Sequence, residues 1–212
     1  MSFPLVLLLD ACTDRFLAGG KAAGLARLMA EGFPVPPGFC LTSEAYWQFL
    51  SEQQMDAAAI WTQVQKATGA ARAAVLEDCR RQIYQGRLSG ECLSELQRHL
   101  QTMPRSAEQL WAVRSSATNE DDTRASFAGL YRTVLGVAGD QLAAAIQTVW
   151  ASLWDERVVT YYERVGWSDR PPAMAVVIQP ALDARAAGVL YTVHPVTGRD
   201  DQIVVNVVPG LA

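Results

Sequence analysis

The chain has 212 residues, of which 50% are hydrophobic and 19% charged, and its formal net charge is −4. This length fits one domain, or one domain and part of another, at roughly 100–200 residues per domain. The apolar content is enough to bury a substantial core, which excludes global disorder. The acidic balance disfavours a broad face for nucleic acid, although a few convergent cations can still hold one phosphate.

Cysteine usage and the N-terminal residues indicate where the protein resides. The four cysteines are dispersed and form no CxxC pair: Cys12, Cys40, Cys79 and Cys92. They predict small buried residues in a reducing compartment. The apolar run over 3–9 ends at Asp10, follows no basic segment, and is far shorter than the roughly 20 residues of a membrane span. We therefore expect a cytoplasmic protein with no membrane partner.

Apolar patterning predicts the first elements. The run over 5–9 is typical of a short buried strand. From Lys21 the apolar residues recur at helical spacing, and Gly32 follows where a helix takes its left-handed stop. A second strand over 39–41 leads to Ser43, which is a good N-cap for the next helix.

The middle of the chain begins with a helical region over 56–104, which carries no cluster of catalytic residue types. Its expected role is that of a scaffold or an insertion. An apolar run then begins at Leu110 and stops at Arg114, which predicts a strand that brings Arg114 to its end. Another strand over 131–137 and an amphipathic helix over 142–153 follow.

The last third is rich in strand signals. Two apolar runs, over 174–179 and 188–193, are joined by a polar turn and predict a hairpin. A third strand is expected over 203–208. The sequence stops at Ala212 without a closing helix or a polar tail, so we expect the parent protein to continue beyond it.

A glycine pair marks the first candidate binding residue. Gly19 and Gly20 precede Lys21 at the start of a helix, where backbone N–H groups and the helix dipole favour an anion. Ala22 stands where a Walker A loop needs Ser or Thr, so this is not that motif. Two interpretations stay open: a phosphate ligand, or a glycine turn followed by a solvated lysine.

Arg114, followed by Ser115 and Ser116, is the second candidate. A guanidinium can grip two phosphate oxygens at once, so this cluster predicts an anion clamp. The alternative is a salt bridge from Arg114 to one of the acidic residues 120–122. The two histidines stand in no catalytic or metal-ligating pattern, and no GxGxxG occurs, which disfavours a nucleophilic triad, a histidine-based metal centre and a dinucleotide fold.

Several modest motifs follow one another in a fixed order. They are Gly19 to Leu25, Val35 to Phe39, Val113 to Ala117 with Glu120 and Asp121, Ser126 to Gly129, Val149 to Leu153, Gln179, Gly188 to Thr192 and Pro195 to Gly198. Together they resemble the N-terminal nucleotide-binding domain of the phosphoenolpyruvate synthase, pyruvate phosphate dikinase and rifampin phosphotransferase family. The resemblance covers nearly the whole chain apart from the helical region.

The resemblance implies a fold and a set of binding residues. The fold is α/β (α+β) and ATP-grasp-like, with the N-terminal lobe, the beginning of the second lobe and a helical insertion. Residues 1–212 would be part of this ATP-binding domain, with the helical region over 56–104 and a β-rich nucleotide-binding part over 105–212. By carry-over, Lys21 and Arg114 would hold phosphates, Gly129 and its flap would cover them, Thr133 would hydrogen-bond the nucleotide, and Gln179 would lie at the hinge beside the adenine.

The implied activity is that of a dikinase-like phosphotransferase, in which ATP phosphorylates a histidine on a separate domain for transfer to pyruvate or another acceptor. The cofactors would be ATP and Mg²⁺, with the metal ligands beyond residue 212, so no catalytic residue and no metal ligand is expected within this chain. The implied partners are the phosphohistidine and acceptor-binding domains of the parent protein. The alternatives are a rifamycin phosphotransferase and a truncated, non-catalytic binding or interaction module; alone, the chain is expected not to turn over.

Two positions depart from the pattern of this family. Leu130 stands where many relatives carry Gln, and His194 stands where Asn or Asp is common before the proline. Both departures put local contacts in question without affecting Lys21 or Arg114.

Overall fold

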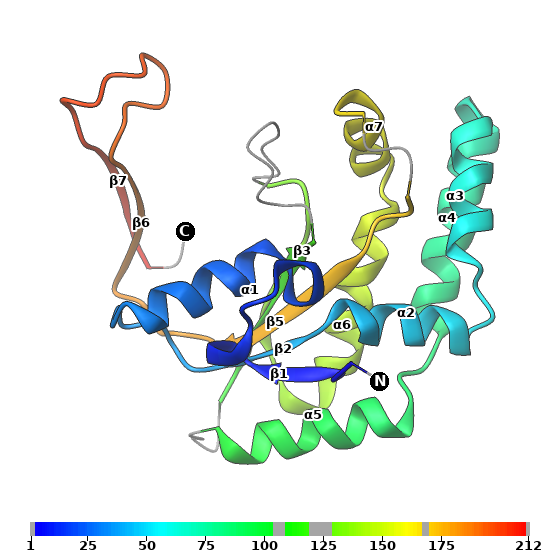
Figure 1. The fold of residues 1–212 in the computed structure, drawn as a ribbon, viewed down its shortest axis with the longest axis horizontal. Helices are drawn as coiled ribbons and strands as arrows, with labels where there is room; N and C mark the ends of the chain where they lie inside the picture. The colour runs from blue at the N-terminus through cyan, green and yellow to red at the C-terminus, as the bar shows by residue number, and fades with distance from the viewer. Residues whose placement is uncertain (1–2, 104–108, 119–128, 167–169, 211–212) are drawn as a thin grey trace. The chain divides into compact units, whose positions relative to one another are not determined.

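The computed structural model describes residues 3–103, 109–118, 129–166 and 170–210. The chain divides into two compact units, Met1–Pro180 and Ala181–Ala212, which are described separately (Figure 1). In the described part of the chain, no helix combines the length and the apolar character needed to cross a bilayer.

A five-stranded sheet forms the centre of the first unit. Its strands, in spatial order, are β1 (Val6–Leu8), β2 (Phe39–Leu41), β5 (Met174–Pro180), β3 (Trp111–Ala117) and β4 (Thr133–Val137). Every neighbouring pair is antiparallel. Helices combined with an antiparallel sheet agree with the expected α+β class.

The helices cover both faces of this sheet. They are α1 (Arg15–Ala30), α2 (Ser43–Glu52), α3 (Ala57–Lys66), α4 (Gly69–Gln85), α5 (Gly90–Thr102), α6 (Leu142–Ala151) and α7 (Glu156–Arg164), with single 3₁₀ turns at Leu9–Ala11, Gly139–Gln141 and Ser152–Trp154. Helix α1 packs on one face against β3 and β5, and α2 and α6 pack on the other (Figure 1). The site discussed below lies on the α1 face.

The larger core lies on the face covered by α2 and α6 and is rich in aromatic residues. Trp150 and Trp154 are fully buried, and each indole N–H has an acceptor. The indole Nε1 of Trp150 donates to the carbonyl of Met174 at 3.2 Å, and that of Trp154 donates to the hydroxyl of Tyr46 at 3.0 Å. These bonds connect α6 to β5 and connect the 3₁₀ turn after α6 to α2, and they satisfy both buried indole donors.

The helical region expected over 56–104 contains α3, α4 and α5. Two of these helices begin at side-chain caps: the Asp56 carboxylate accepts from the amide of Ala59, and the Ser89 hydroxyl accepts from the amide of Cys92. Gln147 on α6 is buried and donates its amide to the carbonyl of Gly86 at 2.8 Å, just after α4. This bond connects the helical region to α6, which packs on the sheet.

Two boundary predictions in the first unit were wrong. Ser43 is the first residue of α2 and Thr42 occupies the N-cap position; the Ser43 hydroxyl instead donates to the carbonyl of Phe16 at 3.0 Å. Arg114 is not at the end of its strand, because β3 continues through Ala117. The continuation is polar in sequence but buried, since α1 covers one face of it.

The second unit is a two-stranded antiparallel ribbon of β6 (Ala186–Tyr191) and β7 (Val204–Pro209). The predicted hairpin between 174–179 and 188–193 was wrong: β5 pairs with β2 and β3, and β6 pairs with β7. Both runs do form strands, but their apolar character does not identify their partners.

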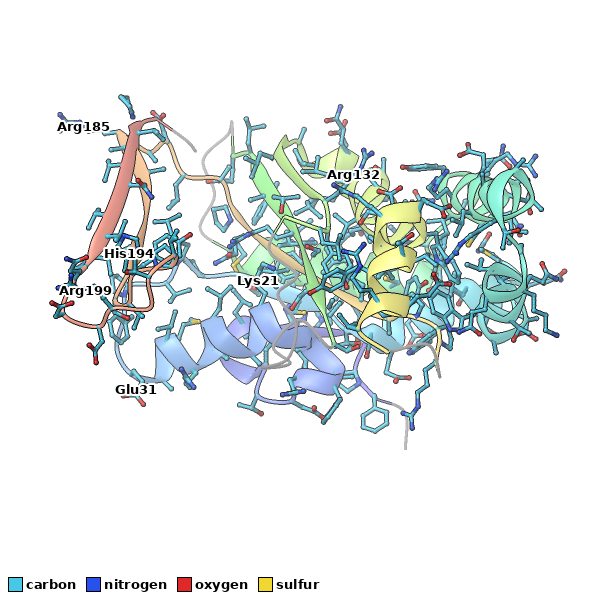
Figure 2. The ribbon with its side chains drawn as sticks, turned by 90° about the horizontal axis from the view of Figure 1, so that it is seen from above. Lys21, Glu31, Arg132, Arg185, His194 and Arg199 are labelled. Carbon is cyan, nitrogen blue, oxygen red and sulfur yellow. The ribbon has the colours of Figure 1, made fainter. Side chains whose placement is uncertain are left out.

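The loop that joins β6 and β7 contains His194, which is labelled in Figure 2. Its ring Nδ1 accepts from the amides of Val196 and Thr197, each at 3.2 Å. Asn and Asp side chains make the same kind of turn through an oxygen acceptor. The departure from the family pattern at this position is therefore compatible with an ordered turn.

Candidate functional site

The first feature of the site is a break in α1 at Gly19. This residue has φ +78° and ψ 165°, outside the helical region, and the helix restarts after it. A Cβ atom at Gly19 would lie only 2.0 Å from the carbonyl oxygen of Ser116, so a side chain does not fit there. The glycine pair noted in the sequence therefore marks a break held against β3.

The break places Lys21 in the first turn of the restarted helix. Amide groups in a first turn lack intrahelical acceptors and carry the positive end of the helix dipole. The Lys21 side chain adds a full positive charge at this point. Lys21, labelled on α1 in Figure 2, is partly exposed, as an anion ligand must be.

Lys21 and Arg114 line the same cavity, although 93 positions of sequence separate them. The cavity has a volume of about 900 Å³ and is lined mostly by residues of α1. This volume is within the usual range for sites of small molecules and cofactors. The fold therefore brings the two predicted phosphate ligands to one cavity.

The strand register gathers other candidates around Arg114. Arg114 lies directly opposite Thr133 on β4 and Val177 on β5. Since cross-strand partners point to the same face, Thr133 shares the α1 face with Arg114. Gln179 lies two residues beyond Val177 on β5, and thus on this face as well. Four of the five candidates therefore come from the α1 face of the sheet or from α1 itself.

Gln179 contacts Arg114 directly. Its side chain is 5% exposed, and its Oε1 accepts from Nη1 of Arg114 at 3.4 Å. Its Nε2 donates to the carbonyl of Pro36 at 2.9 Å. Gln179 thus connects the guanidinium to the proline-rich loop before β2, a role the sequence did not suggest. Its expected place beside the adenine stays a prediction.

Gly129 is exposed and has φ +71°, a backbone conformation that favours glycine. The flap residues 126–128, before Gly129, lie outside the described residues, as do the acidic residues 120–122. The covering role of Gly129 and the alternative salt bridge to Arg114 both stay predictions.

The described residues contain no group of three or more His, Cys, Asp or Glu side chains that could hold a metal ion. Because Mg²⁺ in nucleotide sites is usually held by one or two carboxylates and the phosphates, the place of the ion implied by the family resemblance stays a prediction.

The cysteines are core residues, as the sequence predicted. All four are buried and free. Burial raises the pKa of Cys79 and of Cys92 to about 12 and raises that of Cys40 well above the ordinary thiol value. Because a thiol must lose its proton to act as a nucleophile, these three are inert near neutral pH.

The two hydroxyls after Arg114 do not form part of an anion clamp with it. Ser115 points to the opposite face, where its strand partner is Val176 in the larger core. Ser116 shares the face of Arg114, but its side chain is fully buried and bonded to α1. Nothing in the sequence near these two serines indicates that one hydroxyl hydrogen-bonds a helix nearly a hundred residues earlier.

The chain is similar in sequence to several curated proteins. The chain is 37% identical to a phosphoenolpyruvate synthase of Aeropyrum pernix, over 98% of this chain and 26% of the relative. It is also 37% identical to the prodigiosin synthesizing transferase PigC of Serratia marcescens, over 95% of this chain and 21% of the relative. A rifampicin phosphotransferase of Streptomyces sviceus is 37% identical over 86% of this chain and 21% of its own length.

The chain thus spans only a fifth to a quarter of these curated relatives. The domain family described as "Pyruvate phosphate dikinase, AMP/ATP-binding domain" matches residues 16–212, which include α1 except its first residue and, of the described strands, all but β1. With Lys21 and Arg114 at one cavity, the chain belongs to the AMP/ATP-binding domain family of pyruvate phosphate dikinase.

Proposed function

We propose that this chain is the ATP-binding part of a dikinase-like phosphotransferase with an ATP-grasp fold. The observation that carries the proposal is the meeting of Lys21 and Arg114 at one cavity, in a chain of the AMP/ATP-binding family. Phosphoryl transfer depends on positioning and on neutralising phosphate charge more than on covalent chemistry from the protein. Two cations on rigid elements supply both.

Each candidate residue then has a role. Lys21 and the first-turn amides of the restarted helix bind one part of the phosphate chain, and Arg114 grips another part with its paired N–H donors. Gln179 keeps the guanidinium oriented through its bond to Arg114. Thr133, exposed beside Arg114, hydrogen-bonds the nucleotide, and Gly129 with its flap covers the phosphates.

The reaction we propose is transfer of a phosphoryl group from ATP to a histidine on another domain of the parent protein, and from there to an acceptor. Mg²⁺ would share the phosphate charge through ligands outside the described residues. A phosphoenolpyruvate synthase and a rifampicin phosphotransferase are both 37% identical to this chain, over 98% and 86% of it. The proposal therefore names what their reactions share, ATP-dependent phosphoryl transfer, and pyruvate and a rifamycin remain alternative acceptors.

Calorimetric titration of the chain with MgATP and with adenosine tests the proposal. Arg114→Ala and Lys21→Ala should each weaken ATP binding by about 1.5–3 kcal/mol, the range for hydrogen bonds to charged groups. Adenosine binding should change much less, because adenosine has no phosphates. Lys66→Ala is the matched control, since Lys66 is the other lysine of the chain and lies exposed at the end of α3.

Three results would contradict the proposal. A folded chain that does not bind MgATP would show that these residues do not form a nucleotide site. Unchanged ATP affinity in Arg114→Ala would remove Arg114 from the site. Equal losses for ATP and adenosine in Lys21→Ala would make the lysine structural rather than a phosphate ligand.

A further inference from the structure

The break in α1 contains an inserted side chain. In an unbroken helix, the amide of Ala22 would donate to the carbonyl of Ala18, four residues earlier. Here the hydroxyl of Ser116 stands between them: it donates to the carbonyl of Ala18 at 2.8 Å and accepts from the amide of Ala22 at 3.0 Å. One serine from β3 thus takes the place of one helical hydrogen bond.

Ser116 is built into this position. Its side chain is fully buried, so no water competes for the two bonds. The backbone at Gly19 closes over it, and a Cβ atom at Gly19 would lie 2.4 Å from the hydroxyl oxygen itself. Insertion of a side chain into the hydrogen-bond ladder is a known cause of helix kinks. The kink and the serine are therefore one structural unit.

This unit connects the two cations of the site. Ser116 lies two residues after Arg114 on the same face of β3, and its bond to Ala22 holds the residue directly after Lys21. The restarted helix runs to Ala30, so Lys21 lies in the N-terminal turn of a helix that continues for several residues. A change in the Ser116 bonds would shift Lys21 relative to Arg114 along the cavity that both line.

We propose that Ser116 is a positioning residue for phosphate binding: by replacing the Ala18–Ala22 helical bond, it holds the restarted helix and Lys21 in register with Arg114. Ser116 does not touch the nucleotide in this arrangement, because its hydroxyl is buried and both bonds go to α1. The inference rests on the proposed nucleotide site. It adds that the separation of the two cations is set by a single inserted hydroxyl.

The test compares Ser116→Ala with Ser115→Ala in the 212-residue chain, by calorimetric titration with MgATP and with adenosine. Ser115 is a matched control because it is the neighbouring residue on β3, is also buried, and faces away from α1. Ser116→Ala should weaken ATP binding about tenfold, the equivalent of one hydrogen bond to the site, and leave adenosine affinity within about twofold. Ser115→Ala should bind ATP like the unchanged chain.

Ser116→Cys guards against a variant that fails to fold, since it nearly keeps the size of the side chain while its thiol is only a weak donor and acceptor. It should show the same selective loss for ATP. Unchanged ATP affinity in folded Ser116→Ala or Ser116→Cys, or equal losses for ATP and adenosine, would overturn the positioning role while the nucleotide site stands. Absence of ATP binding by the unchanged chain would overturn the proposed function, and this inference with it.

Discussion

Replacing Gly19 by alanine tests the break in α1 through stability alone. At φ +78° and ψ 165°, a region that is essentially accessible to glycine alone, a side chain adds a backbone strain of about 1–3 kcal/mol. The new methyl group would also lie 2.0 Å from the carbonyl oxygen of Ser116, which forces local displacement. Overpacking of this kind costs typically about 1–3 kcal/mol. Together these effects should lower the free energy of unfolding by about 2–6 kcal/mol.

Gly24→Ala is the matched control for this experiment. Gly24 lies in the same helix, and a Cβ atom there would have no neighbour within 4 Å. Because alanine favours a helix over glycine, this variant should be more stable by about 0.5–1 kcal/mol. Urea unfolding followed by tryptophan fluorescence gives both changes at once. A loss below about 0.5 kcal/mol in Gly19→Ala would refute the close contact between α1 and β3.

Two further predictions concern the core. Tyr46→Phe removes the acceptor of the buried Trp154 indole and should lower the free energy of unfolding in urea by about 1–3 kcal/mol. The control Tyr84→Phe, at a half-exposed position, should lower it by less than about 0.5 kcal/mol, and equal urea midpoints for the two variants would contradict the buried bond. Burial, and then the neighbouring charge of Arg98, lower the pKa of His99 from its ordinary value, so below about pH 6.5 the unfolded chain binds a proton more readily than the folded chain. Stability should therefore fall as the pH drops from about 7 to 5, and His99→Gln should flatten that fall in thermal unfolding; a variant with the original slope would refute the assignment.

Local signals were enough to predict much of the secondary structure. The buried strands appear in the sequence as short apolar runs, and the helical region appears as amphipathic stretches separated by glycines. Gly32, with φ +81°, does follow the end of α1 as its position predicted. These successes share a cause: each depends on residues that are neighbours in the sequence.

The failures depend on contacts between distant residues. The hairpin prediction failed because β5 pairs with strands that come much earlier in the chain. The role of Ser116 could not be predicted, because the atoms it bonds are 98 and 94 residues away in sequence. Lys21 and Arg114 were each predicted to be anion ligands from local chemistry, and that role stays a prediction. Their meeting at one cavity came from the family resemblance and from the fold, not from their spacing.

The position of β5 in the sheet governs how the chain folds during synthesis. Strand β5 lies between β2 and β3, yet it is the last of the five strands in sequence. The bond from Gln179 to Pro36 joins residues 143 apart, which a ribosome adds in about 7–30 s at about 5–20 residues per second. Until β5 emerges, the edges of β2 and β3 that it will join have no strand partner. Unpaired strand edges can pair with other chains. The period before β5 is synthesised is therefore the one in which we expect the nascent chain to be most prone to aggregation and to depend most on chaperones.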